Sequence, residues 1–549
     1  MAAYVLSHGG VNVLLLEAGR SYDATAESAM FQVEADAPLN GAGTPDKFFG
    51  FYDAAVGGYE VPGEPYTVAQ GSQFQWWRAR MLGGRTNHWG RVTLRYGPYD
   101  FRTFSREGVG VDWPISYEDI APYYDRVEKL IGVFGAAEGI ENSPDSPPGV
   151  LLPPPPLHAH ELWMQMVLAK QMGIRAVPEH AAILTRPLNG RPACLYATPC
   201  SRGCSIRANF QTPTVLLPPA LATGHLQIRT RAMVYELTLD RRGRATGVHY
   251  IDTSTGTRHF VRGRAVVLAA SACESARILL NSKSGPFPDG LANSSGQVGR
   301  NLTDSVTTAV SAEIPVLQGI PPFNDDGVSI SHATVPWWGH RERAAGRLQF
   351  PTEYHVEMQG GRSMPSVGMF NQQLPNEHGK PLYGKALRER MRNDFGSKVT
   401  LLSFGGMIPN AECRCEIDSS VKDRWGIPVL RFHWKRGVHE LEQARHAVAS
   451  MSGMVSAMGG KPTVFTQADG SFISTGGQIV HEVGTARMGA AATDSVLNSF
   501  GQCWDVRNLY IADGASFAGH ADKNPTETIM ALAWRASDHL VDSFVRKEI

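Results

Sequence analysis

Three of the seven cysteines crowd into one short segment of the chain. Cys194, Cys200 and Cys204 have C-x5-C-x3-C spacing, which places three thiols on one tight loop. Thiolates arranged in this way select soft centres, here zinc or an iron–sulfur cluster. A structural zinc would want a fourth Cys or His within the loop, and none is present. The spacing therefore favours a 3Fe–4S cluster, with free or partly disulfide-bonded cysteines as the alternative.

Glycine-containing motifs lie at both ends of the chain. Residues 81–90 read MLGGRTNHWG, and the paired Gly83 and Gly84 let backbone approach a large planar or phosphorylated ligand without a Cβ clash. The C-terminal part carries HEVGTARMG from His481, then NLYIADG, then NPTET from Asn524. A glycine pair before an aromatic residue is by itself more often an ordinary loop. The three C-terminal motifs together are much more specific.

The first residues of the chain predict half of a βαβ unit. Residues 2–7 are typical of the end of a helix, and Val11–Leu16 is typical of a buried strand that ends at Glu17. In a dinucleotide-binding fold, an acidic residue at this position takes the ribose hydroxyls. The strand and G-x-G-x-x-G turn that precede such a helix are expected to be missing. An unrelated helix–strand pair is the alternative.

The later segments alternate between two kinds of structure. Residues 226–251 predict an antiparallel meander, and residues 265–270 predict a buried parallel strand followed by a helix over 275–280. The proline-rich residues 140–157 predict an extended surface connection. Residues 311–475 are weakly periodic and predict a separate substrate-side layer.

Length and charge exclude several classes of protein. A chain of 549 residues is too long for one small domain. Lys and Arg total 52 and Asp and Glu total 52, so the basic excess needed for sequence-independent nucleic-acid binding is absent. The longest apolar runs fall far short of the roughly 20 residues that span a bilayer. No signal peptide opens the sequence.

The glycine loop and the three C-terminal motifs show that the chain resembles the glucose–methanol–choline (GMC) family of flavin oxidoreductases. The resemblance extends over the whole length of the chain. The resemblance implies an α/β fold with a GMC-type, Rossmann-like FAD-binding domain, lacking its first strand and G-x-G-x-x-G turn, and a mixed or antiparallel-sheet substrate domain. We expect a discontinuous FAD-binding domain over 1–105, 190–310 and 476–549. A connecting arm over 106–189 and a substrate-binding domain over 311–475 complete the expected organisation.

The resemblance also implies which residues bind FAD. Glu17 would contact the adenosine ribose, and the backbone near Val234 would contact the adenine. The Gly83-Gly84 loop would approach the pyrophosphate and the flavin. The other residues expected to contact FAD are Asn87, His88, Asp513, Gly514, Pro525 and Thr526.

His88 leaves two interpretations open. Relatives with Thr-His-Trp at this place include sugar oxidases that attach the flavin 8α-methyl group covalently to this histidine. The alternative is that His88 packs against the isoalloxazine without a bond. The motif does not separate these interpretations.

By motif position, the resemblance implies a catalytic pair, His481 and Asn524. A histidine near neutral pKa can accept the proton of a substrate hydroxyl while a hydride leaves the carbon for flavin N5. We therefore predict His481 as the general base and Asn524 as the residue that orients the hydroxyl. His520 is a rival for the second position, and a structural histidine is the alternative for His481.

The expected reaction is FAD-dependent oxidation of a secondary hydroxyl of a sugar or glycoside to a ketone, with a 3-keto glycoside favoured. Electrons would leave through the 3Fe–4S cluster, which favours a dehydrogenase over an oxidase. Three alternatives remain open: a gluconate-, fructose- or glucose-type dehydrogenase, an oxygen-using sugar oxidase similar to pyranose oxidase, and a truncated, non-catalytic relic.

The expected partners follow from the same resemblance. Related sugar dehydrogenases imply a small accessory subunit and a cytochrome c-type electron acceptor. The expected location is the periplasm, or a membrane reached only through a partner subunit. No nucleic-acid partner is expected.

Overall fold

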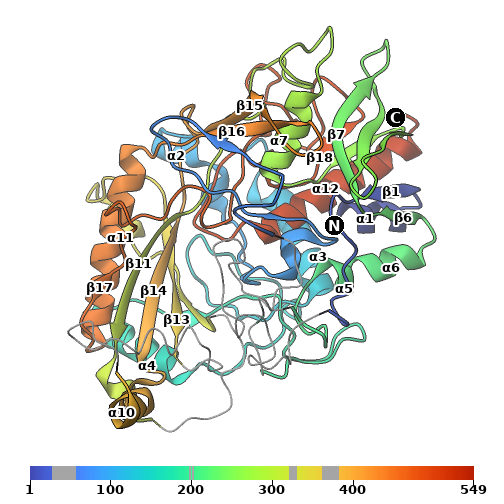
Figure 1. Cartoon of the computed structure of the whole chain (residues 1–549). Helices are drawn as coiled ribbons and strands as arrows, with labels where there is room; N and C mark the ends of the chain where they lie inside the picture. Colours follow the sequence, from blue (N-terminus) through green and yellow to red (C-terminus); the bar gives the residue numbers. More distant parts are fainter. Residues whose placement is uncertain (28–56, 197–199, 201–202, 321–330, 362–381) are drawn as a thin grey trace.

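The computed structural model describes residues 1–27, 57–196, 200, 203–320, 331–361 and 382–549 (Figure 1). The α-helices are α1 (Ala2–His8), α2 (Thr103–Glu107), α3 (Tyr117–Ile131), α4 (Ala159–Val167), α5 (Thr212–Val215), α6 (Leu217–Ala222), α7 (Ala272–Asn281), α8 (His340–Ala344), α10 (Gly384–Asp394), α11 (Val438–Ala457) and α12 (Thr526–Val545). Short 3-10 helices are η3 (Gly84–Asn87), η4 (Pro98–Phe101), η7 (Pro315–Leu317) and η8 (Gly514–Ser516), and η5 (Leu168–Met172) is a π-helix. Within these described ranges, no helix is both long and apolar enough to cross a bilayer.

The strands form several small sheets and one large one. They are β1 (Val13–Leu16), β2 (Gly57–Gly58), β3 (Thr67–Val68), β4 (Arg78–Ala79), β5 (Val177–Pro178), β6 (Leu226–Arg229), β7 (Ala232–Leu239), β8 (Ala245–Asp252), β9 (Arg258–Arg262), β10 (Val266–Leu268), β11 (Val306–Glu313), β12 (Ala333–Val335), β13 (Tyr354–Gly360), β14 (Lys398–Gly405), β15 (Arg414–Lys422), β16 (Pro428–His433), β17 (Thr463–Val464) and β18 (Leu509–Ile511).

The dinucleotide-binding side is built from parallel strand pairs covered by helices. β1 pairs in parallel with β6, and β10 pairs in parallel with β18. Leu6 of α1 and Leu540 of α12 pack into one apolar cluster with Tyr510 of β18 (Figure 1). The predicted N-terminal helix, the strand after it and the later parallel strand are therefore confirmed.

The predicted pairing of one strand of the meander is wrong. Residues 226–230 were expected to lie antiparallel to the strand that follows, but β6 pairs in parallel with β1 instead. The physical reason is burial: Leu226 packs with partly buried Val13 and Leu15 against α6. The hairpin of β7 and β8 around residues 240–243 is as predicted, and β9 adds a third antiparallel strand.

The large sheet is antiparallel, in the order β17-β11-β14-β13-β12-β5. α11 runs along the sheet (Figure 1), and its Met451, Met454 and Val455 pack against strand residues such as Val310 and Leu401. This confirms the antiparallel sheet expected for the substrate side. Its edge strand β5 comes from the predicted connecting arm, and the three domain boundaries stay a prediction.

Two backbone bridges bring the C-terminal motifs to the end of this sheet. Thr303, which precedes β11, bridges to Val483, and Met407, which follows β14, bridges to His520. Side chains from the large sheet and from the C-terminal loops therefore meet where these strands end.

Candidate active site

The His481 side chain is held at one ring nitrogen. Its Nδ1 lies 2.9 Å from Ser305 Oγ, and its backbone N–H donates to Asp304 Oδ1 at 3.0 Å. Val483 exchanges backbone hydrogen bonds of 3.0 Å with Thr303, which fixes the loop beside the strand. Because Nδ1 is engaged by Ser305, Nε2 is the ring nitrogen left to exchange a proton with a ligand.

The surroundings of His481 keep its ring neutral. Burial lowers the pKa of His481 to about 3, and the nearby His520, His355 and Arg85 add to this shift. Phe404 lies between two of these imidazoles, with ring centroids 5.8 Å from His481 and 5.3 Å from His355. A neutral imidazole is the form that accepts a proton, so the ring is in the state that a general base requires.

Two polar residues lie on the loop before α12. Asn524 directly precedes Pro525, the N-cap residue of α12, and its buried Oδ1 makes no hydrogen bond to any described residue. His520 is 5% exposed, and neither ring nitrogen makes a hydrogen bond of normal geometry within the described ranges. Burial lowers the pKa of His520 to about 4. The loop therefore presents both sequence candidates for the second position, with polar atoms available to a ligand.

Glu17 and the glycine loop form a cradle for an extended ligand. Glu17 follows β1, and its Oε1 accepts the Gly19 N–H at 2.7 Å. Gly83 has φ +93°, and a Cβ there would lie 2.6 Å from Pro213, so this position requires glycine. Asn87 donates from Nδ2 to the Leu82 and Gly84 carbonyls at 3.0 and 3.1 Å, while its Oδ1 is buried without a partner among the described residues.

Asp513 and Gly514, which the sequence also assigns to FAD, lie beside the His481 loop. Asp513 accepts from the Ala515 N–H at 2.8 Å and from Ser275 Oγ at 2.5 Å. Burial raises the pKa of Asp513 to about 6. The Gly514 carbonyl accepts the Gly484 N–H at 2.9 Å, three residues after His481. The expected cofactor motif and the expected catalytic motif are thus bonded to each other.

An ion pair with a buried carboxylate connects the glycine loop to the His481 loop. Arg85 in η3 contacts Glu482 Oε2 at 2.6 Å and donates to the Val480 carbonyl at 2.9 Å. The Glu482 side chain is fully buried, whereas the Arg85 side chain is 27% exposed, so solvent reaches one side of the pair. The glycine loop and the His481 loop are therefore held together although they lie about 400 residues apart in the sequence.

Comparison with known families assigns this arrangement. The GMC oxidoreductase N-terminal model matches residues 8–307, and the C-terminal model matches residues 409–533. The chain belongs to the GMC oxidoreductase family. It is accordingly an FAD-binding enzyme of the class that oxidises CH–OH groups.

Several GMC relatives cover most of the chain. A 2-methyl-1,2-propanediol dehydrogenase of Mycolicibacterium austroafricanum is 32% identical, over 84% of this chain and 81% of the relative. The fructose dehydrogenase large subunit of Gluconobacter japonicus is 26% identical, over 99% of this chain and 95% of the relative. A paromamine 6'-oxidase of Streptomyces fradiae is 27% identical, over 86% and 80%. A solved pyridoxine 4-oxidase shares the fold, with a TM-score of 0.59 at 15% identity over 98% of this chain and 96% of that one.

The residues of this GMC chain fit FAD. Pro213 leaves no room for a side chain at Gly83, and the Oδ1 atoms of Asn87 and Asn524 are buried acceptors that no described residue satisfies. Glu17 follows β1 at the position that the resemblance assigns to the adenosine ribose, although burial raises its pKa to about 7. Val234 in β7 pairs with Tyr250 of β8. Individual contacts to FAD stay predictions.

His88 directly follows η3 and is 5% exposed. Its ring packs edge-on against Trp77, with centroids 6.1 Å apart, and burial lowers its pKa to about 3. A neutral, buried imidazole at this place suits both packing against a flavin and covalent attachment to it. Both interpretations of His88, packing against the flavin and covalent attachment to it, therefore stay predictions.

The three cysteines form no disulfide among the described residues and lie in or against two small apolar clusters. Cys194 packs against the cluster of Cys200 and also against that of Cys204. Backbone N–H groups of Tyr196 and Ala208 donate to Cys194 Sγ at 3.3 Å and Cys204 Sγ at 3.2 Å. Residues 197–199 and 201–202 lie outside the described ranges. In the described part of the chain, the three sulfur atoms do not all lie within 4.8 Å of one another, as the ligand atoms of a compact metal site would.

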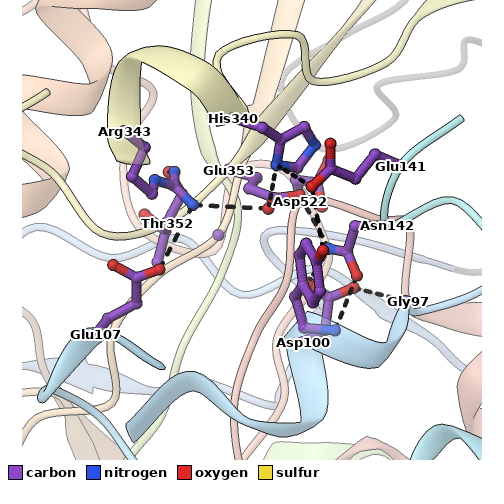
Figure 2. Close-up of polar contacts among 12 residues, drawn as sticks. Gly97, Asp100, Glu107, Glu141, Asn142, His340, Arg343, Thr352, Glu353 and Asp522 are labelled. Atoms are coloured by element: carbon purple, nitrogen blue, oxygen red, sulfur yellow. Dashed lines mark hydrogen bonds and ion pairs between the residues drawn. The ribbon is translucent and has the colours of Figure 1, made fainter. Parts of the chain in front are cut away.

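A small cleft, with a cavity volume of about 40 Å³, lies where β13 meets the loop before α12, and Glu353, His355 and Asp522 are among its lining residues. Figure 2 shows its charged contacts: Asn142 donates to Glu353 at 2.9 Å, and His340 and Arg343 each lie 3.6 Å from Glu353. The ionisable residues that line the cleft are mostly acidic: Glu138, Glu141, Asp145, Glu353 and Asp522, with Lys523, His180 and His355. Lys523 contacts Asp522 at 2.6 Å and is the cation of this group.

Sequence analysis missed the residues that the large sheet contributes. Ser305, His355 and Phe404 reach the site from the start of β11, from β13 and from β14. They lie 77 or more positions from His481 in the sequence, and none belongs to a recognisable motif. Only the antiparallel pairing of these strands brings them together.

Proposed function

We propose that this enzyme oxidises a secondary hydroxyl of a sugar or glycoside to a ketone, with a 3-keto glycoside as product. The observation that carries the proposal is the neutral imidazole of His481, anchored by Ser305 and close to His520 and His355. The buried Asn524 Oδ1, which no described residue satisfies, adds to it. Relatives named fructose dehydrogenase, paromamine 6'-oxidase and C-glycoside 3-oxidase support a sugar substrate.

In the proposed mechanism, His481 removes the hydroxyl proton at Nε2. Ser305 holds Nδ1 and thereby keeps the ring oriented as the proton arrives. The Asn524 carboxamide holds the same hydroxyl through hydrogen bonding. When bound, FAD supplies the two-electron oxidation of the CH–OH carbon.

The cleft suits a polyhydroxyl substrate. Carboxylates accept hydrogen bonds from sugar hydroxyls, and Glu141, Glu353 and Asp522 line its wall. The indole of Trp337 lines the same cleft and supplies an apolar ring face. These groups recognise several hydroxyls without specifying which one is oxidised.

We further propose that electrons leave through a 3Fe–4S cluster at Cys194, Cys200 and Cys204. Backbone N–H donors already point at two of the three sulfurs, as is common around such clusters. A small accessory subunit and a cytochrome c-type acceptor in the periplasm would complete the pathway. The relative named a fructose dehydrogenase large subunit supports an enzyme that works with further subunits.

Product analysis on lactose tests the reaction. A 3-keto disaccharide supports the proposal, whereas oxidation at another carbon favours a gluconate-, fructose- or glucose-type dehydrogenase. Absence of bound flavin, judged by its absorbance spectrum, would leave only the non-catalytic relic.

Iron and labile-sulfide analysis of the purified enzyme tests the electron pathway. Three iron atoms for each flavin are expected. The variant Cys200→Ser should lose its bound iron and keep its flavin. An iron-free enzyme that releases hydrogen peroxide would instead be a sugar oxidase.

A further inference from the structure

A second cluster of ligating side chains lies away from the cleft, where the segment before α4 meets the start of β12. His158, Glu161 and His332 each offer one ligand atom, and these atoms lie within 4.8 Å of one another. All three residues are buried, and none of them lines the cleft near Glu353. The motifs of the FAD site and the cysteine loop do not include them.

The carboxylate of Glu161 is already fixed in place. Its Oε2 accepts the His158 N–H at 2.8 Å, and its Oε1 accepts the His332 N–H at 2.6 Å. Oε2 also lies 3.0 Å from His158 Nδ1. Neighbouring ligands of a tetrahedral ion with bonds of about 2.0 Å are separated by about 3.3 Å. An ion can therefore replace the proton between these two atoms with little movement.

The His332 ring presents an unused lone pair. Its Nδ1 lies 3.1 Å from the Pro156 carbonyl, which can only accept, so Nδ1 carries the proton. Nε2 is then unprotonated, and this buried atom has no hydrogen-bond partner in the described part of the chain. A backbone carbonyl on the second ring nitrogen is the arrangement that orients metal-binding histidines. The ring stacks on His158, with centroids 4.0 Å apart.

Glu161 also lacks a strong counter-charge. Its one ion-pair contact among described residues is with His158. The other compact ligand group, Asp100, Glu353 and Asp522, differs because it already surrounds the Lys523 ammonium. Hydrogen bonds hold both oxygens of this carboxylate, and a bound divalent ion would add the full counter-charge that they do not supply.

We propose that His158, Glu161 and His332 bind one divalent transition-metal ion of the zinc class. Two imidazole nitrogens and one carboxylate oxygen suit zinc and its neighbours rather than calcium or magnesium. The ion has a structural role, because its ligands join α4 to β12 near the edge of the large sheet.

The test uses the full chain after chelator treatment and titration with Co²⁺, which reports its ligands in its visible spectrum. Binding of one equivalent with weak d–d bands is expected, distinct from the intense near-ultraviolet charge transfer of cobalt–thiolate bonds at the cysteines. Zn²⁺ should displace this cobalt and raise the melting temperature of the chelated protein.

Two variants decide the outcome. His332→Gln should weaken this cobalt binding by more than about tenfold. The matched control is His446→Gln, a histidine of the same domain bonded to Tyr354, which should bind as the unaltered chain does. His158→Gln replaces His332→Gln if the latter does not fold. Absence of the weak-band cobalt species in the unaltered chain, or equal affinity in the folded ligand variant, would overturn the proposal.

Discussion

His481 combines two properties that a sequence motif does not reveal. Ser305 holds its Nδ1 at 2.9 Å, and burial beside two other histidines lowers its pKa to about 3. The ring therefore stays neutral through the physiological range and cannot turn away from the site. The neutral ring can accept a proton, although a pKa of about 3 makes it a weaker base than the near-neutral histidine that the sequence predicted.

Replacing His481 with Gln should reduce kcat by about 10²- to 10⁴-fold, because a positioned general base contributes about that much. The measurement is the anaerobic rate of flavin bleaching at saturating substrate, with flavin content determined in parallel. His259→Gln, an exposed histidine in β9, is the control and should be unaffected. Wild-type turnover in His481→Gln would contradict the assignment.

The pH profile of kcat/KM should carry the low pKa of His481. A base acts in its deprotonated form, so activity persists above the folded-state pKa and is lost as pH falls through it. With the pKa of His481 at about 3, no acid limb is expected near about 6.5, where an unperturbed histidine titrates. An acid limb between about pH 6 and 7 that disappears in His481→Gln would show that the ring is not shifted in the working enzyme.

At the scale of elements, the glycine loop is a short segment whose shape is imposed by its neighbours. Gly83 adopts φ +93°, and Pro213 occupies the space a Cβ would need. η3 begins one residue later and carries Arg85 toward the His481 loop. The loop therefore positions both the cofactor and the catalytic segment.

Gly83→Ala should destabilise the chain by about 2 kcal/mol or more and weaken flavin retention, because it combines a positive φ with a clash. Gly90→Ala is the matched control on the same loop, since a Cβ there meets nothing within 4 Å and its φ is ordinary. Urea unfolding monitored by flavin fluorescence measures both variants. Equal stability of the two variants would show that the loop adapts to a side chain.

The Arg85–Glu482 pair should behave as a coupled unit. Arg85→Met leaves the fully buried Glu482 carboxylate without its cation, and such a loss costs about 3 to 5 kcal/mol. The double variant Arg85→Met, Glu482→Met should be more stable than Arg85→Met alone, because no unpaired charge remains. A double-mutant cycle of unfolding free energies measures the coupling, and additive losses would refute it.

At the scale of the whole molecule, buried ionisable groups act in opposite directions on acid stability. Burial lowers the pKa of several histidines to about 3 or 4, among them His88, His481 and His520. Burial raises the pKa of four carboxyl groups to about 6 or 7: Glu17, Asp304, Glu353 and Asp513. As pH falls from about 6.5, the unfolded chain protonates the histidines first, which destabilises the fold. Over the same range the folded chain protonates the carboxyl groups first, which stabilises it.

The unfolding free energy should therefore change little between about pH 6.5 and 4.5 and fall below about pH 4. In that lower range the carboxyl groups are protonated in both states, whereas the histidines are charged only in the unfolded chain. Urea titrations across pH 3 to 7 measure the curve. A steep loss between about pH 6.5 and 5 would mean that the buried carboxyl groups do not oppose the histidines.

Sequence patterns predicted much of the molecule where the signal was local. The helix and strand before Glu17, the hairpin around residues 240–243 and the parallel strand at 265–270 all have short-range patterns, and the structure confirms them. The strand at 226–230 was placed in the wrong pairing, because its partner β1 lies about 210 residues earlier. Alternation along one strand does not specify a distant partner.

Sequence motifs alone identified the GMC family and predicted the FAD-contacting residues and the pair His481 and Asn524, because glycine turns and motif spacing are properties of contiguous residues. Tertiary structure decided which groups surround that pair. Ser305, His355 and Phe404 reach His481 only because antiparallel strands place distant residues side by side. The shifted pKa of His481 has the same origin, since burial and neighbouring charges exist only after the chain has packed.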